Sequence, residues 1–137
     1  MRREHILEVD YRTEPGRPAG AKQLPNLRVR PDSVFAVNDS VAIGAIQATQ
    51  EFGLRVPEDF GVIGVGNTRY NEYLRIPLSS VDLHPVEVGK SAASILLSMI
   101  DNKPAPRRPV FIEPTLVARA SSCRTRLAPG PVPSQVK

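Results

Sequence analysis

Apolar and polar residues follow one another in blocks along this chain, and the length of the blocks predicts strands followed by helices. Residues 33–37 form an apolar block of strand length, and residues 61–65 form a second one. Segments with a helical spacing of apolar residues begin after Asp39 and again at Pro85. Strands that alternate with helices are typical of a parallel sheet covered by helices. The pattern therefore predicts an α/β protein.

The two expected helices have recognisable ends. Asp39 is predicted to cap the first helix, because its carboxylate can accept hydrogen bonds from the free N–H groups of the first turn. Gly53 is predicted to end that helix in a left-handed conformation, and Pro85 suits the first turn of the second helix. The apolar face of the first helix is predicted to comprise Val41, Ala45, Ala48 and Phe52, with Ala42, Ile46 and Thr49 beside it. The apolar face of the second is predicted to comprise Val86, Gly89, Ala93, Leu96 and Ile100.

Shorter elements are predicted in the rest of the chain. Prolines and glycines weaken a possible helix at 17–25, so a loop followed by a short helix is expected there. Residues 122–137 are rich in proline, glycine and serine and are predicted to be a disordered tail, which leaves 1–121 as the folded unit. Short strands are expected at 6–11, 79–82, 110–112 and 115–117.

Composition and charge narrow the class of protein. The 137 residues are 41% hydrophobic and 23% charged, which is ordinary for one soluble domain. There is no apolar run near 18 residues, and no apolar segment follows the basic start, so a cytoplasmic protein without a membrane span is expected. The formal net charge is +4, but seven basic residues and one acid lie in 103–137, and 1–102 is slightly acidic. This distribution does not indicate a basic surface for nucleic acid.

The residue types that carry catalysis or bind metals are not grouped in this sequence. Cys123 is the only cysteine, so no intrachain disulfide is possible, and its thiol is expected to be inert. His5 and His84 are far apart and lack the spacing of zinc ligands. The serines at 79–80 have no base nearby, and 64–66 is too short for a dinucleotide fingerprint. We therefore expect neither an enzyme nor a cofactor.

Several motifs, in one order along the chain, resemble LacI/GalR-type transcription regulators. Residues 31–39, followed by 42–45, are similar to the strand-to-helix signature of that family. Further similar pieces lie at 53–59, 62–64, 77–81, 88–89 and 114–121. The resemblance extends from about Ile6 to Ser121 without large gaps.

This resemblance implies one incomplete lobe of a periplasmic-binding-protein-like fold. In the family, two similar lobes enclose an effector cleft, and the chain resembles the latter half of that domain. The expected structure is a partial three-layer sandwich with a mostly parallel sheet, followed by the segment that returns towards the first lobe. The DNA-binding head, the hinge helix, the first lobe and the opening strand–helix unit of the second have no counterpart here. Operator DNA would be reached only through that head.

The resemblance also implies an effector site at Tyr11, Asn38 and Asn67, for a ligand of the sugar or purine class. Tyr11 has the alternative of a surface tyrosine, and Asn38 that of helping the helix cap. Gly66 stands where relatives often carry an acid that binds the effector, so the usual polar contacts are lost or rearranged.

A dimer contact is implied along the first helix and the loop at 68–75. For Ala45 and Ala48, packing against the sheet is an equally open alternative. The expected function is ligand sensing and dimerisation within a LacI-type regulator. The alternative is a fragment of a sugar-type solute-binding protein of a transporter, against which the absence of a signal segment and the 38–39 motif both count. The implied contact residues are Val41, Ala45, Ala48, Tyr73 and Leu74.

Overall fold

The computed structural model describes Ile6 and residues 31–101, 104 and 108–124. The strand predicted at 6–11, except for Ile6, and the helix predicted at 17–25 lie outside the described residues, as does Tyr11.

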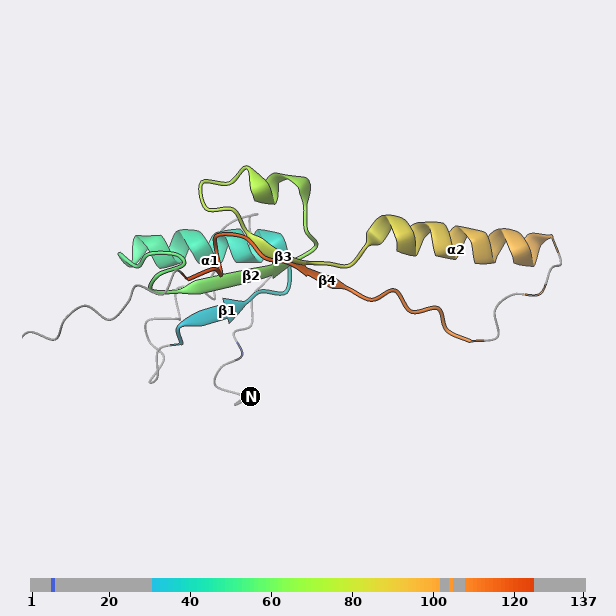
Figure 1. Ribbon diagram of the computed structural model, residues 1–137, viewed down its shortest axis with the longest axis horizontal. Coiled ribbons are helices and arrows are strands. Elements are labelled where there is room, and N and C mark those ends of the chain that lie inside the picture. Colours follow the sequence, from blue (N-terminus) through green and yellow to red (C-terminus); the bar gives the residue numbers. More distant parts are fainter. Residues whose placement is uncertain (1–5, 7–30, 102–103, 105–107, 125–137) are drawn as a thin grey trace, which may run out of the picture.

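A four-stranded, mostly parallel sheet forms the centre of the structure (Figure 1). The strands lie in the order β1-β2-β3-β4; β1 pairs with β2 and β2 with β3 in parallel, whereas β4 is antiparallel to β3. The α/β class with a mostly parallel sheet is thus confirmed. The strands are β1 Ser33–Phe35, β2 Gly61–Val65, β3 Ser79–Asp82 and β4 Thr115–Val117.

Helix α1, Asp39–Glu51, packs against β2 and covers one face of the sheet (Figure 1). The residue that caps it is Asn38, whose extended backbone lets its side-chain oxygen accept a hydrogen bond from Val41 N at 2.8 Å. The prediction that Asp39 caps the helix is wrong. The strand before the helix, β1, ends at Phe35 and not at residue 37 as predicted. The cap position falls at Asn38, one residue before Asp39.

The end of α1 follows the prediction for Gly53 but not that for Phe52. Gly53 has a φ of 75° and donates to Gln50 O, while Leu54 N donates to Thr49 O, which together satisfy two free carbonyls of the last turn. Phe52 is 47% exposed, so it does not belong to the buried face of the helix. Ala45 and Ala48 are buried as predicted. The rest of the buried face lies on the side of the residues predicted beside it, and is formed by Ala42, Gly44, Ile46 and Thr49.

The hydrophobic core lies between α1 and the sheet and is small. Three large side chains in it are almost fully buried, Phe60, Val62 and Leu78. Because the helix contributes mainly alanines, its backbone lies close to β2. The remaining core residues are Ala36, Ala42, Ala45, Ile46, Ala48 and Val56.

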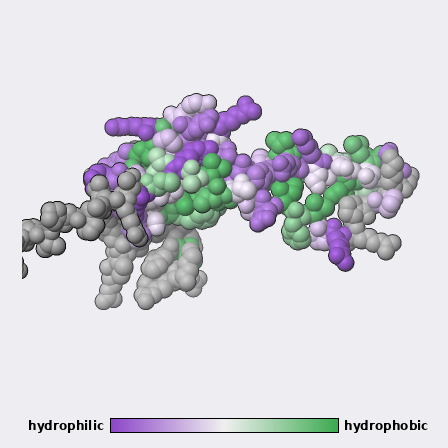
Figure 2. Space-filling model, in the orientation of Figure 1, coloured by the Kyte–Doolittle hydropathy of each residue, from purple (hydrophilic) through white to green (hydrophobic). Residues whose placement is uncertain are grey.

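A second helix, α2 Pro85–Ile100, projects away from the sheet (Figure 1). Its bounds agree with the prediction, with Pro85 in the first turn. No residue of α2 is buried, so the apolar face predicted for it is open to solvent within the described part of the chain. The returning segment contains no strand at 110–112, contrary to the prediction, because β4 pairs with β3 only over Thr115–Val117. Figure 2 shows hydrophobic surface on this projecting part as well as around the sheet.

Candidate functional site

The carboxyl ends of the parallel strands bring together residues that are distant in the sequence. Asn38 and Asp39 follow β1, Gly66 and Asn67 follow β2, and Asp82 ends β3. We call these five residues the strand-end edge. Gly66 N donates to Val81 O at 2.8 Å, which holds the end of β2 against β3. In open α/β sheets, ligands bind in the crevice outside such strand ends.

The carboxylate of Asp39 is the centre of a buried hydrogen-bond network, although its residue begins a helix. Asp39 is 2% exposed. Its Oδ1 accepts from Ser80 Oγ at 2.6 Å, and its Oδ2 accepts from Asn71 Nδ2 at 2.8 Å and from Thr68 N at 2.9 Å. The Thr68 hydroxyl lies 3.0 Å from the same Oδ2. One side chain therefore joins α1, β3 and the short 3-10 helix η3, Arg69–Glu72.

Opposing effects determine the pKa of Asp39. Burial disfavours the charged form and raises the pKa, but the hydrogen bonds from Ser80, Thr68 and Asn71 together outweigh that penalty. The result is a pKa below the ordinary value of 3.8. The carboxylate is therefore ionised at neutral pH and accepts hydrogen bonds at both oxygens.

The lowered pKa of Asp39 predicts a loss of stability in acid. The unfolded chain takes up the proton at a higher pH than the folded chain, so this contribution is complete above the unfolded pKa and declines as pH falls through the folded pKa. Urea unfolding between about pH 5 and about pH 3 should show a falling midpoint in the parent and a flatter dependence in Asp39→Asn. An equally steep decline in the variant would contradict the prediction.

Asn38 is the residue of the strand-end edge whose side-chain nitrogen has no hydrogen-bond partner in the described part of the chain. Its Oδ1 caps α1, as described above, so the alternative of a cap is confirmed for the oxygen. Among the described residues, no hydrogen bond is formed by its Nδ2. The capped oxygen fixes the carboxamide while leaving a donor for a ligand that carries hydrogen-bond acceptors.

Asn67 lies at the edge as predicted, but its carboxamide is already bonded within the protein. Its Nδ2 donates to Asp82 Oδ2 at 2.9 Å, and its Oδ1 accepts from Arg119 Nη2 at 2.8 Å. The Asn67 amide, together with the backbone N–H of His84, holds the pKa of Asp82 below its usual value. A direct contact between Asn67 and an effector stays a prediction.

Gly66, where the resemblance implies an acid in relatives, has a φ of 124°, a backbone conformation that residues with a side chain rarely adopt. A Cβ at this position would lie 3.3 Å from Asp39 Oδ2. A carboxylate here would therefore be strained and would stand beside an existing negative charge. Glycine at position 66 is therefore consistent with the positive φ of this residue and with its closeness to the Asp39 carboxylate.

Residues 1–122 match the family described as "Periplasmic binding protein-like domain". The chain belongs to this family. Its relatives identify it further as a LacI/GalR-type effector-binding domain. It is 36% identical to the HTH-type transcriptional repressor PurR of Mannheimia succiniciproducens over 121 residues, which is 88% of this chain and 36% of that protein. It is 38% identical to the ribose operon repressor of Haemophilus influenzae over 116 residues, or 85% of this chain and 35% of the repressor.

Solved structures of LacI-family proteins share the fold. A regulatory protein of the LacI family from Chloroflexus aggregans has a TM-score of 0.70 and 31% identity, covering 77% of this chain and 38% of its own. A LacI family regulator from Arthrobacter sp. FB24, in complex with lactose, has a TM-score of 0.67 and 30% identity, covering 75% and 39%. The chain thus spans about a third of the length of the curated relatives that it matches.

The structure separates the residues of the implied dimer contact of this LacI/GalR-type domain. Ala45 and Ala48 are 5% and 3% exposed within the single chain, which favours the alternative that they pack against the sheet. Tyr73 is 81% exposed, and Val41 and Leu74 are partly buried against the core. An interface at this position would therefore be formed mainly by the loop after η3.

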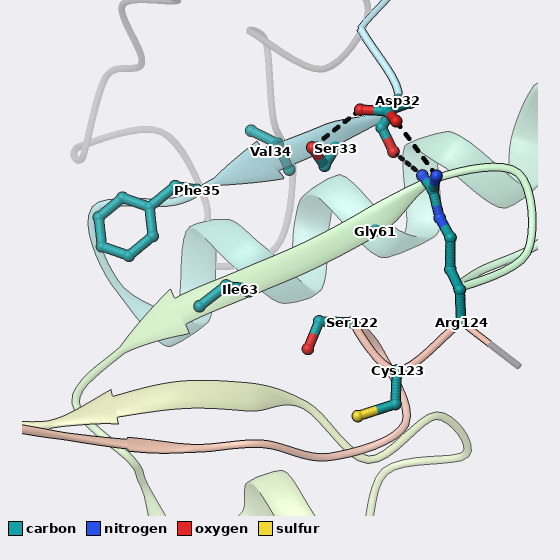
Figure 3. A pocket seen from close by; sticks show the side chains of 9 residues that line it. All are labelled: Asp32, Ser33, Val34, Phe35, Gly61, Ile63, Ser122, Cys123 and Arg124. Atoms are coloured by element: carbon teal, nitrogen blue, oxygen red, sulfur yellow. Dashed lines mark hydrogen bonds and ion pairs between the residues drawn. The ribbon is translucent and has the colours of Figure 1, made fainter.

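A groove of about 660 Å³ runs along the sheet face opposite α1 (Figure 3). Phe35 and Ile63 point into it, and Ser122 and Cys123 line its other side. The groove contains neither Asn38 nor Asn67, so it is separate from the strand-end edge. The first three residues of the predicted tail pack here: Arg124 donates to Pro57 O and pairs with Asp32 at 3.1 Å. Residues 125–137 lie outside the described part.

The described part of the chain contains no group of three potential metal-ligating side chains, and none of its helices is long and apolar enough to cross a membrane.

Sequence reasoning missed the residues that surround Asp39, namely Thr68, Asn71 and Ser80. All three carry small polar side chains, which are common in loops, and nothing in their spacing connects them to Asp39. The abrupt change from apolar residues to the Asn38–Asp39 pair was the available signal, and it located one end of the network only.

Proposed function

We propose that this chain is the ligand-sensing and dimerisation part of a LacI-type transcription regulator. The observation that carries the proposal is the donor of Asn38, held at the carboxyl ends of parallel strands in a domain of this family. Its ligand is a small molecule with hydrogen-bond acceptors, of the sugar or purine class. Tyr11 and Asn67 are further proposed contacts.

The relatives support a regulator over the alternative of a transport protein. The curated relatives described above are repressors, and the solved neighbour from Arthrobacter is a transcriptional regulator in complex with lactose. We propose no catalytic role, because the described edge carries amides and carboxylates that are hydrogen-bonded within the protein and has no paired nucleophile and base.

Nuclear magnetic resonance titration tests the ligand proposal. Lactose, ribose, sucrose and guanine, each added to the labelled chain, are the probes. We expect at least one of them to shift the amide signals of residues 37–40 and 66–68. Asn38→Asp keeps an oxygen acceptor for the cap but removes the donor, so it should retain the fold and weaken the shifts. Shifts confined to other surfaces, or unchanged in Asn38→Asp, would contradict the proposed site.

The exposed apolar residues predict self-association. Val86, Leu96 and Ile100 of α2 and the ring of Tyr73 are all more than half exposed, and apolar patches of this kind drive association. Light scattering should report a dimer or a larger species. Tyr73→Ser should shift the equilibrium towards the monomer if the loop after η3 forms the interface. A stable 15.0 kDa monomer over a wide concentration range would refute the prediction.

Operator recognition is not expected from this chain alone. The net positive charge lies in residues 103–137, while 1–102 is slightly acidic, and no basic recognition helix is found among the described helices. In a gel-shift assay, a short duplex should be retarded weakly, if at all, and without dependence on its sequence. Retardation that distinguishes an operator sequence from a scrambled duplex would contradict this expectation.

A further inference from the structure

Two chain segments connect α2 to the rest of the structure, and they run beside each other (Figure 1). Residues 78–84 lead outward through β3, and residues 115–121 return through β4. We call these two segments the tether. Since no residue of α2 is buried, the tether determines where the helix lies within the described structure.

The side chain of Asn67 holds both segments of the tether at once. As described for the site, its amide nitrogen bonds Asp82 at the end of β3, and its oxygen bonds Arg119 after β4. The Arg119 guanidinium also donates to Leu78 O at 2.8 Å, so it reaches the start of the outgoing segment. Asn67 itself belongs to neither segment, and its backbone N–H is anchored on Ser80 Oγ at 2.9 Å.

Asp82 connects the hydrogen bonds of Asn67 to the bend that precedes α2. Its Oδ1 accepts from the backbone N–H of His84 at 2.7 Å, and its Oδ2 receives the Asn67 bond. His84 has a φ of 49° and turns the chain sharply into the helix. Its ring Nε2 lies 3.1 Å from Thr115 Oγ1, which joins the two segments a second time. A continuous set of hydrogen bonds therefore extends from Asn67 to the base of α2.

We propose that Asn67 is a positioning residue, a clamp that sets the direction in which the tether leaves the sheet and hence the position of α2. A carboxamide suits this role because its donor and acceptor point in fixed, different directions, here to a carboxylate and a guanidinium. Hydrogen bonds with one charged partner are stronger than neutral ones. The clamp goes beyond the proposed function and operates whether or not the edge binds a ligand.

The position of α2 relative to the sheet and α1 can be measured by pulsed electron paramagnetic resonance, as a distance between spin labels on α1 and α2. Spin labels are attached at Gln50→Cys on α1 and Ser94→Cys on α2, two exposed positions, after Cys123→Ser removes the native thiol. Labelled chains are diluted with unlabelled ones to suppress distances between molecules. The parent should give one narrow distance distribution.

Asn67→Gly is the principal variant, because Asn67 has a φ of 47°, and glycine keeps that backbone while removing the carboxamide. We expect its distance distribution to shift or broaden. Asp82→Asn can keep an oxygen acceptor for the His84 N–H but replaces the acceptor of the Asn67 amide by a donor, so it should have the same effect. Arg124→Ala is the control, since it removes a hydrogen-bonded guanidinium from the opposite end of the sheet and should leave the distribution unchanged.

Distributions that superimpose on the parent in both Asn67→Gly and Asp82→Asn would overturn the proposal. Equal broadening in Arg124→Ala would also overturn it, because general loosening would then explain the result. The urea midpoint of each variant shows that it is folded. If Asn67→Gly does not fold, Asp82→Asn decides the question, because it can keep the hydrogen bond to His84 N. Ligand titration plays no part in this experiment, so its failure is distinct from failure of the proposed function.

Discussion

Asp39→Ala is expected to cause a large loss of stability, although it removes no large apolar side chain from the core. The variant removes the acceptor shared by Ser80, Thr68 and Asn71 and leaves the donors of Ser80 and Asn71 buried and that of Thr68 partly buried. Each stranded buried donor costs about 1–3 kcal/mol, so the free energy of unfolding should fall by about 3 kcal/mol or more. Urea denaturation followed by circular dichroism measures this change.

Glu51→Ala is the matched control for that substitution. It removes an exposed carboxylate from the last turn of the same helix and should leave the urea midpoint nearly unchanged. If Asp39→Ala changed the midpoint no more than Glu51→Ala, the network would not contribute to stability as described.

Gly64→Ala is the second substitution with a large expected effect. A Cβ on Gly64 would lie 2.5 Å from Asp39 Oδ1 and 3.1 Å from both the Ala42 Cβ and the Asp39 Cα. The added methyl must push α1 away from β2 and disturb the hydrogen bonds of Asp39. Overpacking of this kind costs about 1–3 kcal/mol, and the disturbed network adds to that cost.

Gly89→Ala controls for the added methyl group. A Cβ at Gly89 on α2 meets nothing within 4 Å, and alanine favours a helix more than glycine, so stability should hold or rise. Combining Gly64→Ala with Asp39→Ala should cost less than the sum of the two, because the first clash is with the Asp39 carboxylate. Strict additivity would show that Gly64 acts through other contacts.

Local patterns were sufficient to predict most of the regular elements. Gly53 ends α1 and Pro85 begins α2 because of their own backbone preferences. The strand β2 is a continuous apolar block. Each of these features depends only on residues that are close in the sequence, so the sequence pattern was enough to predict it. The strand predicted at 110–112 failed because pairing depends on a partner strand, and β3 is long enough to pair only with Thr115–Val117. The rotation of α1, which exposes Phe52, depends on the close approach of β2 at Gly64.

The strand-end edge was located from sequence, but its internal contacts were not. Asn38 and Asp39 are both residue types that cap helices, and the actual cap depends on where β1 ends. The partners of Asp39 are 29 to 41 positions away in the sequence, so only the folded sheet brings them to it. The same is true of Asn67, whose partner Arg119 is 52 positions away.

The attachment of Arg124 to Asp32 has a consequence for the order of folding. These residues are 92 positions apart in the sequence. In contrast, β1, α1 and β2 follow one another directly along the chain, so the contacts among them close much shorter loops. Closing a long loop costs more entropy than closing a short one, and contacts distant in sequence form more slowly. The unit of β1, α1 and β2 is therefore expected to assemble early and the segment around Arg124 to dock last, so Arg124→Ala should mainly accelerate unfolding while leaving the refolding rate unchanged.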